Sequence, residues 1–240
     1  MPKLEHEHTA EAIAARIASA DHNYIRDFIY GGIDGSVTTF AVVSGVSGAE
    51  LATSIVLILG FANLAADGFS MAASNYLGTR AEQDDYQRLE KIEYRHIEVA
   101  PEGEREEIRQ IYREKGFEGD ELEKAVELIT ADKDRWVKTM LTEEYGLPSE
   151  IRSPWRAAFT TFAAFVVCGL VPLLPYVFGI ASSFLVSCTT TGITFFLIGS
   201  VKSRWSTASW IRSGFETLFV GALAAILAYA VGILLKGIAA

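Results

Sequence analysis

Acidic side chains recur at helical spacing in a strongly charged stretch between residues 81 and 150. Three pairs stand three or four positions apart and would share a helix face: Glu90 and Glu93, Glu104 and Glu107, and Met140 and Glu144. Turned toward one another, these faces would form an oxygen-rich cage with one thioether, which suits a divalent first-row metal better than magnesium or calcium. An acidic helix surface is more often only a solvated face, so the spacing alone leaves both interpretations open.

Glu93 and His96 form a Glu-x-x-His element, which ferritin-like di-iron bundles use twice, on two helices. The sequence contains one copy. A membrane-anchored di-iron oxidase therefore stays as an alternative, and so does a protein that only buffers metal. His6 and His8, close to the amino terminus, are more typical of incidental histidines than of ligands.

A second set of polar side chains lies inside apolar segments. Asp34 stands in the run GGIDGSVTTF, and Asn63, Asp67, Met71 and Asn75 follow one another every four residues. Acids inside a membrane span generally face the bundle interior or a water-filled path, which makes Asp34 and Asp67 functional candidates. A structural role for Asp67, such as a pair with Arg80, is the alternative. The glycines around Asp34 have the spacing that permits close helix approach, and they could also open the helix to a passing ion.

Half of the 240 residues are apolar, yet the net charge is -9, so apolar and charged residues are segregated along the chain. Five segments are nearly free of charge and about long enough to span a bilayer: 28–48, 51–79, 157–178, 180–201 and 214–235. We expect an all-α protein with five membrane-spanning helices and a helical insert between the second and third. The expected parts are an amphipathic segment 1–23, spans at 24–80, a metal-binding insert 81–152 and spans at 153–240. In the insert we expect helices at about 81–99, up to Lys115, and at about 120–145.

The distribution of Lys and Arg predicts the orientation of the chain in the membrane. The links around residues 46–52 and 172–180 contain no Lys or Arg, whereas the amino-terminal segment, the insert and the 202–212 link do. We therefore expect the amino terminus and the insert to be cytoplasmic and the carboxyl terminus to be outside. Cys168 and Cys188 fall within predicted spans and are interpreted as small packing residues.

Several ordered motifs resemble those of the vacuolar iron transporter family, in its prokaryotic branch. YIRDFIYGGIDGSVTTFAVVSG and GFANLAADGFSMAASNYLG resemble its first two spans. EKIE, PEGEREEI and TMLTEEYG resemble its metal-binding insert, and VPLLP at 171–175 also fits. The resemblance covers most of the chain from about residue 24 onward.

The resemblance implies a homodimer in a prokaryotic cell membrane that exports cytosolic Fe²⁺, often also Mn²⁺, in exchange for protons along a path between the subunits. It assigns metal ligands within the membrane to Asp34 and Met71 and a cytoplasmic-mouth acid to Asp27, with Asp67 as a nearby acid. In the insert it assigns ligands to Glu90, Glu93, Glu104, Glu107, Met140 and Glu144. It implies no enzyme activity, no nucleic-acid partner and no cofactor besides the transported or bound metal.

The chain departs from the family pattern at three points. The segment between Glu93 and Pro101 is a few residues longer than the plant-type pattern. The family's paired methionines are Met140 and Leu141, and Asn75 stands where an acid is common. Asp67 is the acid that we expect to replace it.

Overall fold

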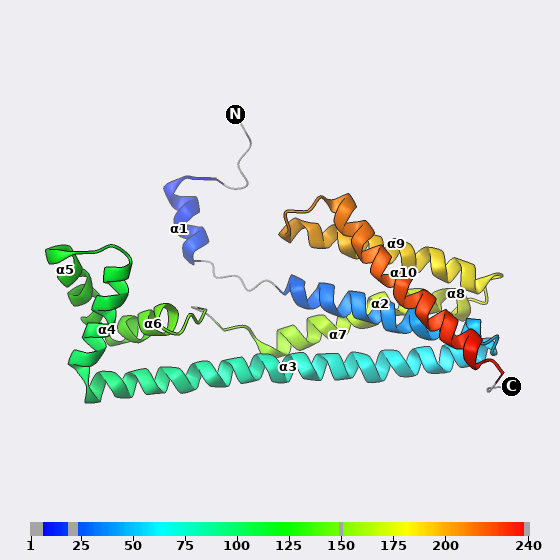
Figure 1. The fold of residues 1–240 in the computed structure, drawn as a ribbon, viewed down its shortest axis with the longest axis horizontal. Helices are drawn as coiled ribbons and strands as arrows, with labels where there is room; N and C mark the ends of the chain where they lie inside the picture. Colours follow the sequence, from blue (N-terminus) through cyan, green and yellow to red (C-terminus); the bar gives the residue numbers. More distant parts are fainter. Residues whose placement is uncertain (1–6, 19–23, 149–150, 238–240) are drawn as a thin grey trace. The chain divides into compact units, whose positions relative to one another are not determined.

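The computed structural model of the chain describes residues 7–18, 24–148 and 151–237, and every regular element in these residues is a helix (Figure 1). The elements are α1 (Ala10–Ala18), α2 (Ile25–Gly48), α3 (Thr53–Val99), α4 (Pro101–Glu114), α5 (Gly119–Thr130), α6 (Lys133–Glu143), α7 (Pro154–Leu170), η1 (Val171–Leu173), α8 (Leu174–Val177), α9 (Ser183–Lys202), η2 (Ser203–Trp205) and α10 (Trp210–Leu235). This confirms the all-α prediction.

The chain divides into two compact units, each described by itself below. One unit, called here the insert unit, comprises Met1–His22 and Gly78–Ser153. The other, the membrane unit, comprises Asn23–Leu77 and Pro154–Ala240. The helix α3 contributes to both, because it continues without interruption from Thr53 to Val99. The helix expected at about 81–99 is therefore the continuation of the helix that contains residues 53–79.

Four helical segments among the described residues are long and apolar enough to cross a membrane: Thr53–Val99, Pro154–Val177, Ser183–Trp205 and Trp210–Leu235. The helix α2 is 24 residues long but falls short of the same criterion, because glycines, hydroxyl groups and acids lower its hydropathy. It packs against α7, α9 and α10. A helix enclosed by other helices exposes little surface to lipid, so it needs fewer apolar residues than an outer helix.

Glycines explain how closely α2 approaches its neighbours. A Cβ at Gly31 or at Gly35 would collide with the backbone of Thr161 or Phe165 in α7. The small-residue spacing around Asp34 thus predicted a close helix contact correctly. Farther along α2, Gly45 meets α10, where a Cβ at Gly232 would collide with the Gly45 carbonyl. These contacts fix the backbone of α2 on both sides of Asp34.

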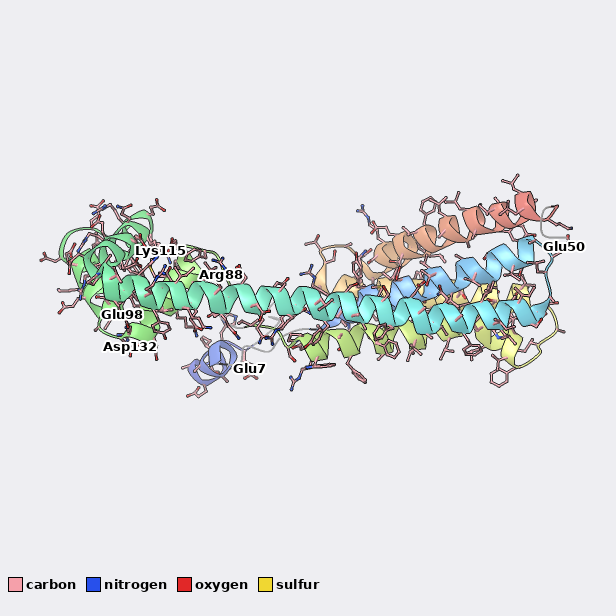
Figure 2. The ribbon with its side chains drawn as sticks, turned by 90° about the horizontal axis from the view of Figure 1, so that it is seen from below. Glu7, Glu50, Arg88, Glu98, Lys115 and Asp132 are labelled. Carbon is pink, nitrogen blue, oxygen red and sulfur yellow. The ribbon has the colours of Figure 1, made fainter. Side chains whose placement is uncertain are left out.

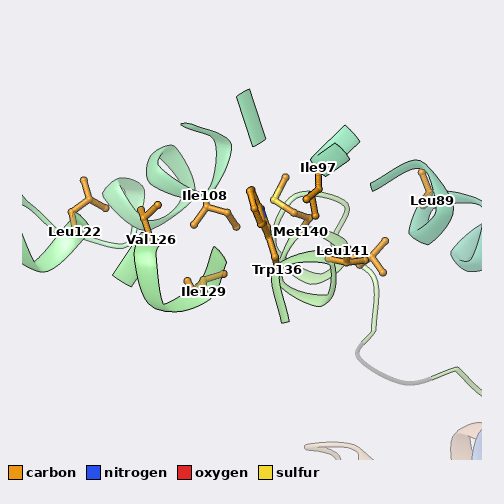
Figure 3. Close-up of a cluster of buried hydrophobic side chains, with 10 residues drawn as sticks. Leu89, Ile97, Ile108, Leu122, Val126, Ile129, Trp136, Met140 and Leu141 are labelled. Carbon is orange, nitrogen blue, oxygen red and sulfur yellow. The ribbon is translucent and has the colours of Figure 1, made fainter. Parts of the chain in front are cut away.

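In the insert unit, the carboxyl-terminal part of α3 packs with α4, α5 and α6 around one hydrophobic core (Figure 3). Ile108, Met140 and Leu141 are almost fully buried in it. Pro101 is the first residue of α4, where its missing N–H costs nothing. Charged side chains such as Glu98, Lys115 and Asp132 lie at the surface (Figure 2).

The single helix predicted from about 120 to 145 is wrong, because the chain forms α5 and α6 instead. Asp132 lies between them with extended backbone, and its side chain accepts a hydrogen bond of 2.8 Å from the backbone N–H of Arg135. A capped start of this kind stabilises a new helix by about 1 kcal/mol. The dominance of helix-forming residues concealed the break in the sequence.

The amphipathic segment predicted for residues 1–23 is described only at 7–18, where Ala10–Ala18 forms α1. Thr9 Oγ1 accepts a hydrogen bond of 3.2 Å from the backbone N–H of Ala12 at its start. Residues 1–6, including His6, and residues 19–23 lie outside the described part of the chain.

Candidate metal centre

Two carboxylates that the sequence placed on separate helices meet inside the insert unit. Glu93 in α3 is 1% exposed and Glu104 in α4 is 5% exposed. The sharp turn at Ala100 and Pro101 brings the start of α4 back beside the end of α3. Burying an ionised carboxylate is costly unless a cation or several hydrogen-bond donors accompany it. Yet Glu93 Oε2 and Glu104 Oε2 have no hydrogen-bond partner in the described chain.

His96 is the basic side chain nearest to both acids. Its Nδ1 is 3.8 Å from Glu93 Oε1 and 3.4 Å from Glu104 Oε1. One ligand atom from each of these three side chains lies within 4.8 Å of the others, and no other group of His, Cys, Asp or Glu in the described residues meets this criterion. The sequence showed His96 only as part of a Glu-x-x-His element. Its proximity to Glu104 depends on the turn between α3 and α4 and could not be read from spacing.

Further negative charge surrounds this pair. Burial raises the pKa of Glu104 to about 7, and the charges of Glu107 and Glu93 add to the effect. Burial also raises the pKa of Glu144, together with the charges of Glu107 and Glu93. The structure therefore brings four of the six expected insert ligands into one electrostatic cluster. Such a cluster favours either protons or a metal cation, because like charges at short range cannot all stay ionised without compensation.

Tyr145 is a member of this site that the sequence interpretation missed. Its hydroxyl donates a hydrogen bond of 2.9 Å to Glu93 Oε1. Burial and this hydrogen bond raise the pKa of Tyr145, so the phenol stays protonated and remains a donor. The sequence signal was its place directly after Glu144, at the end of α6. A donor that fixes one oxygen of a carboxylate leaves the other free to bind an ion.

The remaining two expected insert ligands have different surroundings. Met140 is fully buried in the hydrophobic core, close to Ile97 and Trp136 (Figure 3). Glu90 is half-buried one helical turn before Glu93, and its charge contributes to raised pKa values of Tyr86 and Tyr94. The pKa of Tyr94 reaches about 12, mainly because its hydroxyl donates a hydrogen bond to Asp134.

In the membrane unit, the structure brings together the two acids predicted within spans. Asp34 in α2 is half-buried, Asp67 in α3 is exposed, and their charges interact. No Arg, Lys or His forms an ion pair with either in the described residues. The pair with Arg80 that was considered for Asp67 is absent, since Arg80 bonds Asp84 instead.

Polar contacts join α2 and α3 beside these acids. Asn63 Nδ2 donates a hydrogen bond of 3.1 Å to Thr38 Oγ1, and Thr38 donates one of 2.9 Å to the backbone carbonyl of Asp34. Met71 is half-buried on α3, one turn after Asp67. The predicted polar face of α3 is thus only partly turned toward α2.

Asp27 lies two turns before Asp34 and is buried. Asn75 Nδ2 donates hydrogen bonds of 2.9 Å to Asp27 Oδ1 and 2.7 Å to Thr161 Oγ1. Asn75 therefore links α2, α3 and α7. An amide can hold Asp27 in this way as a donor, whereas an ionised acid at the same position could only accept.

Comparisons with known proteins show which proteins the chain is similar to. The profile of the VIT family matches residues 25–233. The chain is 36% identical over 210 residues to vacuolar iron transporter 1 of Arabidopsis thaliana, covering 85% of this chain and 83% of that protein. It is 33% identical over 226 residues to the vacuolar iron transporter of Toxoplasma gondii, covering 89% of this chain and 75% of that protein. It is 32% identical over 230 residues to the vacuolar iron transporter of Plasmodium berghei, covering 91% of this chain and 84% of that protein.

Proposed function

The chain belongs to the VIT family, and from that premise we propose that it exports cytosolic Fe²⁺, with Mn²⁺ as a second cargo, across a prokaryotic cell membrane in exchange for protons. It is an integral membrane protein that transports metal ions and is not an enzyme. The di-iron oxidase alternative is thereby excluded. The direction of transport, the proton coupling and the ion path are the parts that we add.

The observation that carries the proposal is that the charges of Asp34 and Asp67 interact in the membrane unit, while neither acid forms an ion pair with a basic side chain in the described residues. Two acids within apolar spans are costly unless something offsets their charge. A dication that passes between them would do so transiently, and protons would do so when the ion has left. Binding of metal at such a site releases protons, which is the coupling that antiport requires.

A second copy of the chain would complete this site. Asp67 is exposed on an apolar helix, so in an isolated chain it would face lipid. In a homodimer with α2 and α3 near the two-fold axis, paired copies of Asp34, Asp67 and Met71 would line one path. The thioether of Met71 would favour Fe²⁺ over Mg²⁺, because a soft ligand binds transition metals better than it binds hard cations. Here α2 serves as the fifth span.

Asp27 would act at the cytoplasmic mouth of the path. The end of the membrane unit at which α2 begins also holds the end of α9 and the start of α10, with Lys202, Arg204 and Arg212. The opposite end has Glu50 and Lys236 paired with each other. Positive charge usually marks the cytoplasmic side, so we place the amino terminus inside and the carboxyl terminus outside.

The insert, residues 81–152, would collect the cation before transport. Clustered negative charge comes from Glu93, Glu104, Glu107 and Glu144. Glu90 lies on α3 with Glu93, and Met140 lies on α6, which ends directly before Glu144. A carboxylate-rich surface raises the local concentration of divalent cations near the mouth.

Metal uptake into sealed proteoliposomes tests the proposal. We expect uptake of Fe²⁺ and Mn²⁺ by the full chain to accelerate when the compartment that receives the metal is acidic. Asp34→Asn should abolish flux while metal binding by the insert persists. Glu216→Gln is a matched control, because Glu216 is an exposed membrane-unit carboxylate paired with Arg212. Undiminished flux in the Asp34 variant would refute the assignment of the path.

A further inference from the structure

The ligand set expected from the sequence in the insert consists of carboxylates and one methionine, yet the tightest group of donor atoms includes an imidazole. Glu93 and His96 are three residues apart on α3, so both side chains leave the same face of that helix. Glu104 approaches them from α4. The three form a compact group built from two helices.

The distances fit one bound ion after small side-chain movements. Metal–ligand bonds of about 2.1 Å place neighbouring ligand atoms roughly 3.4 Å apart in a tetrahedral site. His96 Nδ1 and Glu104 Oε1 already lie 3.4 Å apart, and His96 Nδ1 and Glu93 Oε1 lie 3.8 Å apart. The largest separation within the group stays below 4.8 Å.

An independent observation points to a cation in the same place. With both carboxylates ionised, Glu93 Oε2 and Glu104 Oε2 are buried and have no hydrogen-bond donor in the described residues. Only a proton shared between Glu104 and Glu93, or a cation, would compensate them. An ion pair with His96 would use Oε1 of each side chain and would leave both Oε2 atoms unsatisfied. A metal ion can bind both oxygens of a carboxylate, so it can reach the Oε2 atoms that an ion pair through Oε1 leaves unsatisfied. The His96 side chain is 43% exposed, so an ion can reach the group from water.

We propose that His96 is a ligand of the ion held by Glu93 and Glu104, and that its nitrogen makes the insert select borderline first-row dications such as Fe²⁺ over Mg²⁺ and Ca²⁺. Imidazole suits iron, zinc and copper, whereas magnesium and calcium prefer oxygen ligands. Carboxylates alone would discriminate poorly between these classes. The inference rests on the proposed role of the insert in binding metal, and it identifies which side chain sets the preference.

The first experiment measures affinity. Fe²⁺, under anaerobic conditions, and Mg²⁺ are titrated separately into the full-length protein in detergent by calorimetry. His96→Gln should weaken Fe²⁺ binding at least about ten-fold and leave Mg²⁺ binding nearly unchanged. Glu98→Gln, an exposed change two residues away, is the control and should alter neither affinity. An equal loss for both ions, or no loss for Fe²⁺, would overturn the role of His96 in selectivity.

The second experiment detects the ligand itself. Pulsed electron paramagnetic resonance of bound Mn²⁺ reports ¹⁴N coupling when a histidine nitrogen binds the ion. The coupling should be present in the wild-type chain, lost in His96→Gln, and retained in His8→Gln. If the coupling persists in His96→Gln, the nitrogen that binds Mn²⁺ does not belong to His96 and the proposal fails. Circular dichroism of His96→Gln establishes that the helices remain folded.

Failure of this inference is distinguishable from failure of the proposed function. Glu93→Gln and Glu104→Gln are measured in the same titrations. If they abolish Fe²⁺ binding while His96→Gln does not, the insert still binds metal and only the role of His96 is wrong. If none of the three changes affects binding, the metal-binding role of the insert is also wrong.

Discussion

Replacing Glu104 by glutamine should stabilise the metal-free insert at alkaline pH and abolish its stabilisation by metal. Burial and neighbouring acids raise the pKa of Glu104 to about 7 from its ordinary value of 4.5. The folded chain therefore binds a proton at Glu104 more tightly than the unfolded chain does. The resulting stability is fully present below pH 4.5 and is lost as pH rises through about 7. Glutamine resembles the protonated acid but does not ionise, so the variant does not lose this stability as the pH rises.

The magnitude follows from the same values. The separation between 4.5 and about 7 corresponds to about 3 kcal/mol of unfolding free energy above neutral pH. Glu107 is exposed, so water and salt screen part of its repulsion. We therefore expect the metal-free Glu104→Gln insert to be about 1–3 kcal/mol more stable than wild type at alkaline pH and nearly equal to it below pH 4.5.

Hydrogen–deuterium exchange of the full-length protein measures this locally, through peptides from α4, α5 and α6. At alkaline pH without metal, exchange in these peptides should be roughly 5- to 100-fold slower in Glu104→Gln than in wild type. Adding Mn²⁺ should reverse the order, because only wild type retains the complete site. Glu102→Gln, on the same helix and with its side chain 89% exposed, is the matched control and should exchange like wild type.

Two outcomes would refute this reasoning. Faster exchange in metal-free Glu104→Gln than in wild type at alkaline pH would mean that the buried carboxylate is stabilised in a way that the structure does not show. Equal protection of both proteins by Mn²⁺ would mean that Glu104 does not bind the ion.

Three further changes test the packing around the two sites. Gly35→Leu should destabilise the membrane unit by about 1–3 kcal/mol or more, because the leucine side chain would collide with the Phe165 backbone. The measurement is the melting temperature, which should fall; an unchanged value would refute the close contact. Asp132→Ala should cost about 1 kcal/mol and speed exchange in the first turn of α6, whereas Asp120→Ala, elsewhere in the insert, should leave that turn unaffected. Tyr145→Phe should weaken Mn²⁺ binding up to about ten-fold in calorimetry without unfolding the insert, because Glu93 loses the donor that orients it; unchanged affinity would refute that role.

Local features of the sequence predicted much of the fold. Four of the five apolar segments predicted as spans form helices that are long and apolar enough to cross a membrane. Small residues around Asp34 predicted the close approach of α2 to α7. The helix expected to end at Lys115 agrees with α4, which ends at Glu114 with Lys115 as its cap. These features succeed because length, hydropathy and the absence of a Cβ act directly on neighbouring residues. The break at Asp132 was missed because a cap competes with strong helix formers and the outcome depends on packing.

The candidate site was less accessible to sequence reasoning, because burial and cross-helix distances are tertiary properties. Spacing grouped Glu93 with Glu90, but the structure places Glu93 beside Glu104 and His96 and leaves Glu90 near two tyrosines. The thioether of Met140 predicts a metal ligand, whereas the structure shows this side chain fully buried in the core. The turn between α3 and α4 decides which carboxylates of these helices face each other. Helical periodicity within one helix cannot predict the geometry of that turn.

Metal-driven proton movement is the most direct test of the central claim, that Asp34 and Asp67 exchange a dication for protons within the membrane. Sealed proteoliposomes that contain the full-length protein and an internal pH-sensitive dye are given external Fe²⁺ under anaerobic conditions, with no initial pH gradient. We predict that the interior becomes alkaline as metal enters, and that Asp34→Asn eliminates both signals together. Metal entry with no change in internal pH, once membrane potential is clamped, would contradict the account.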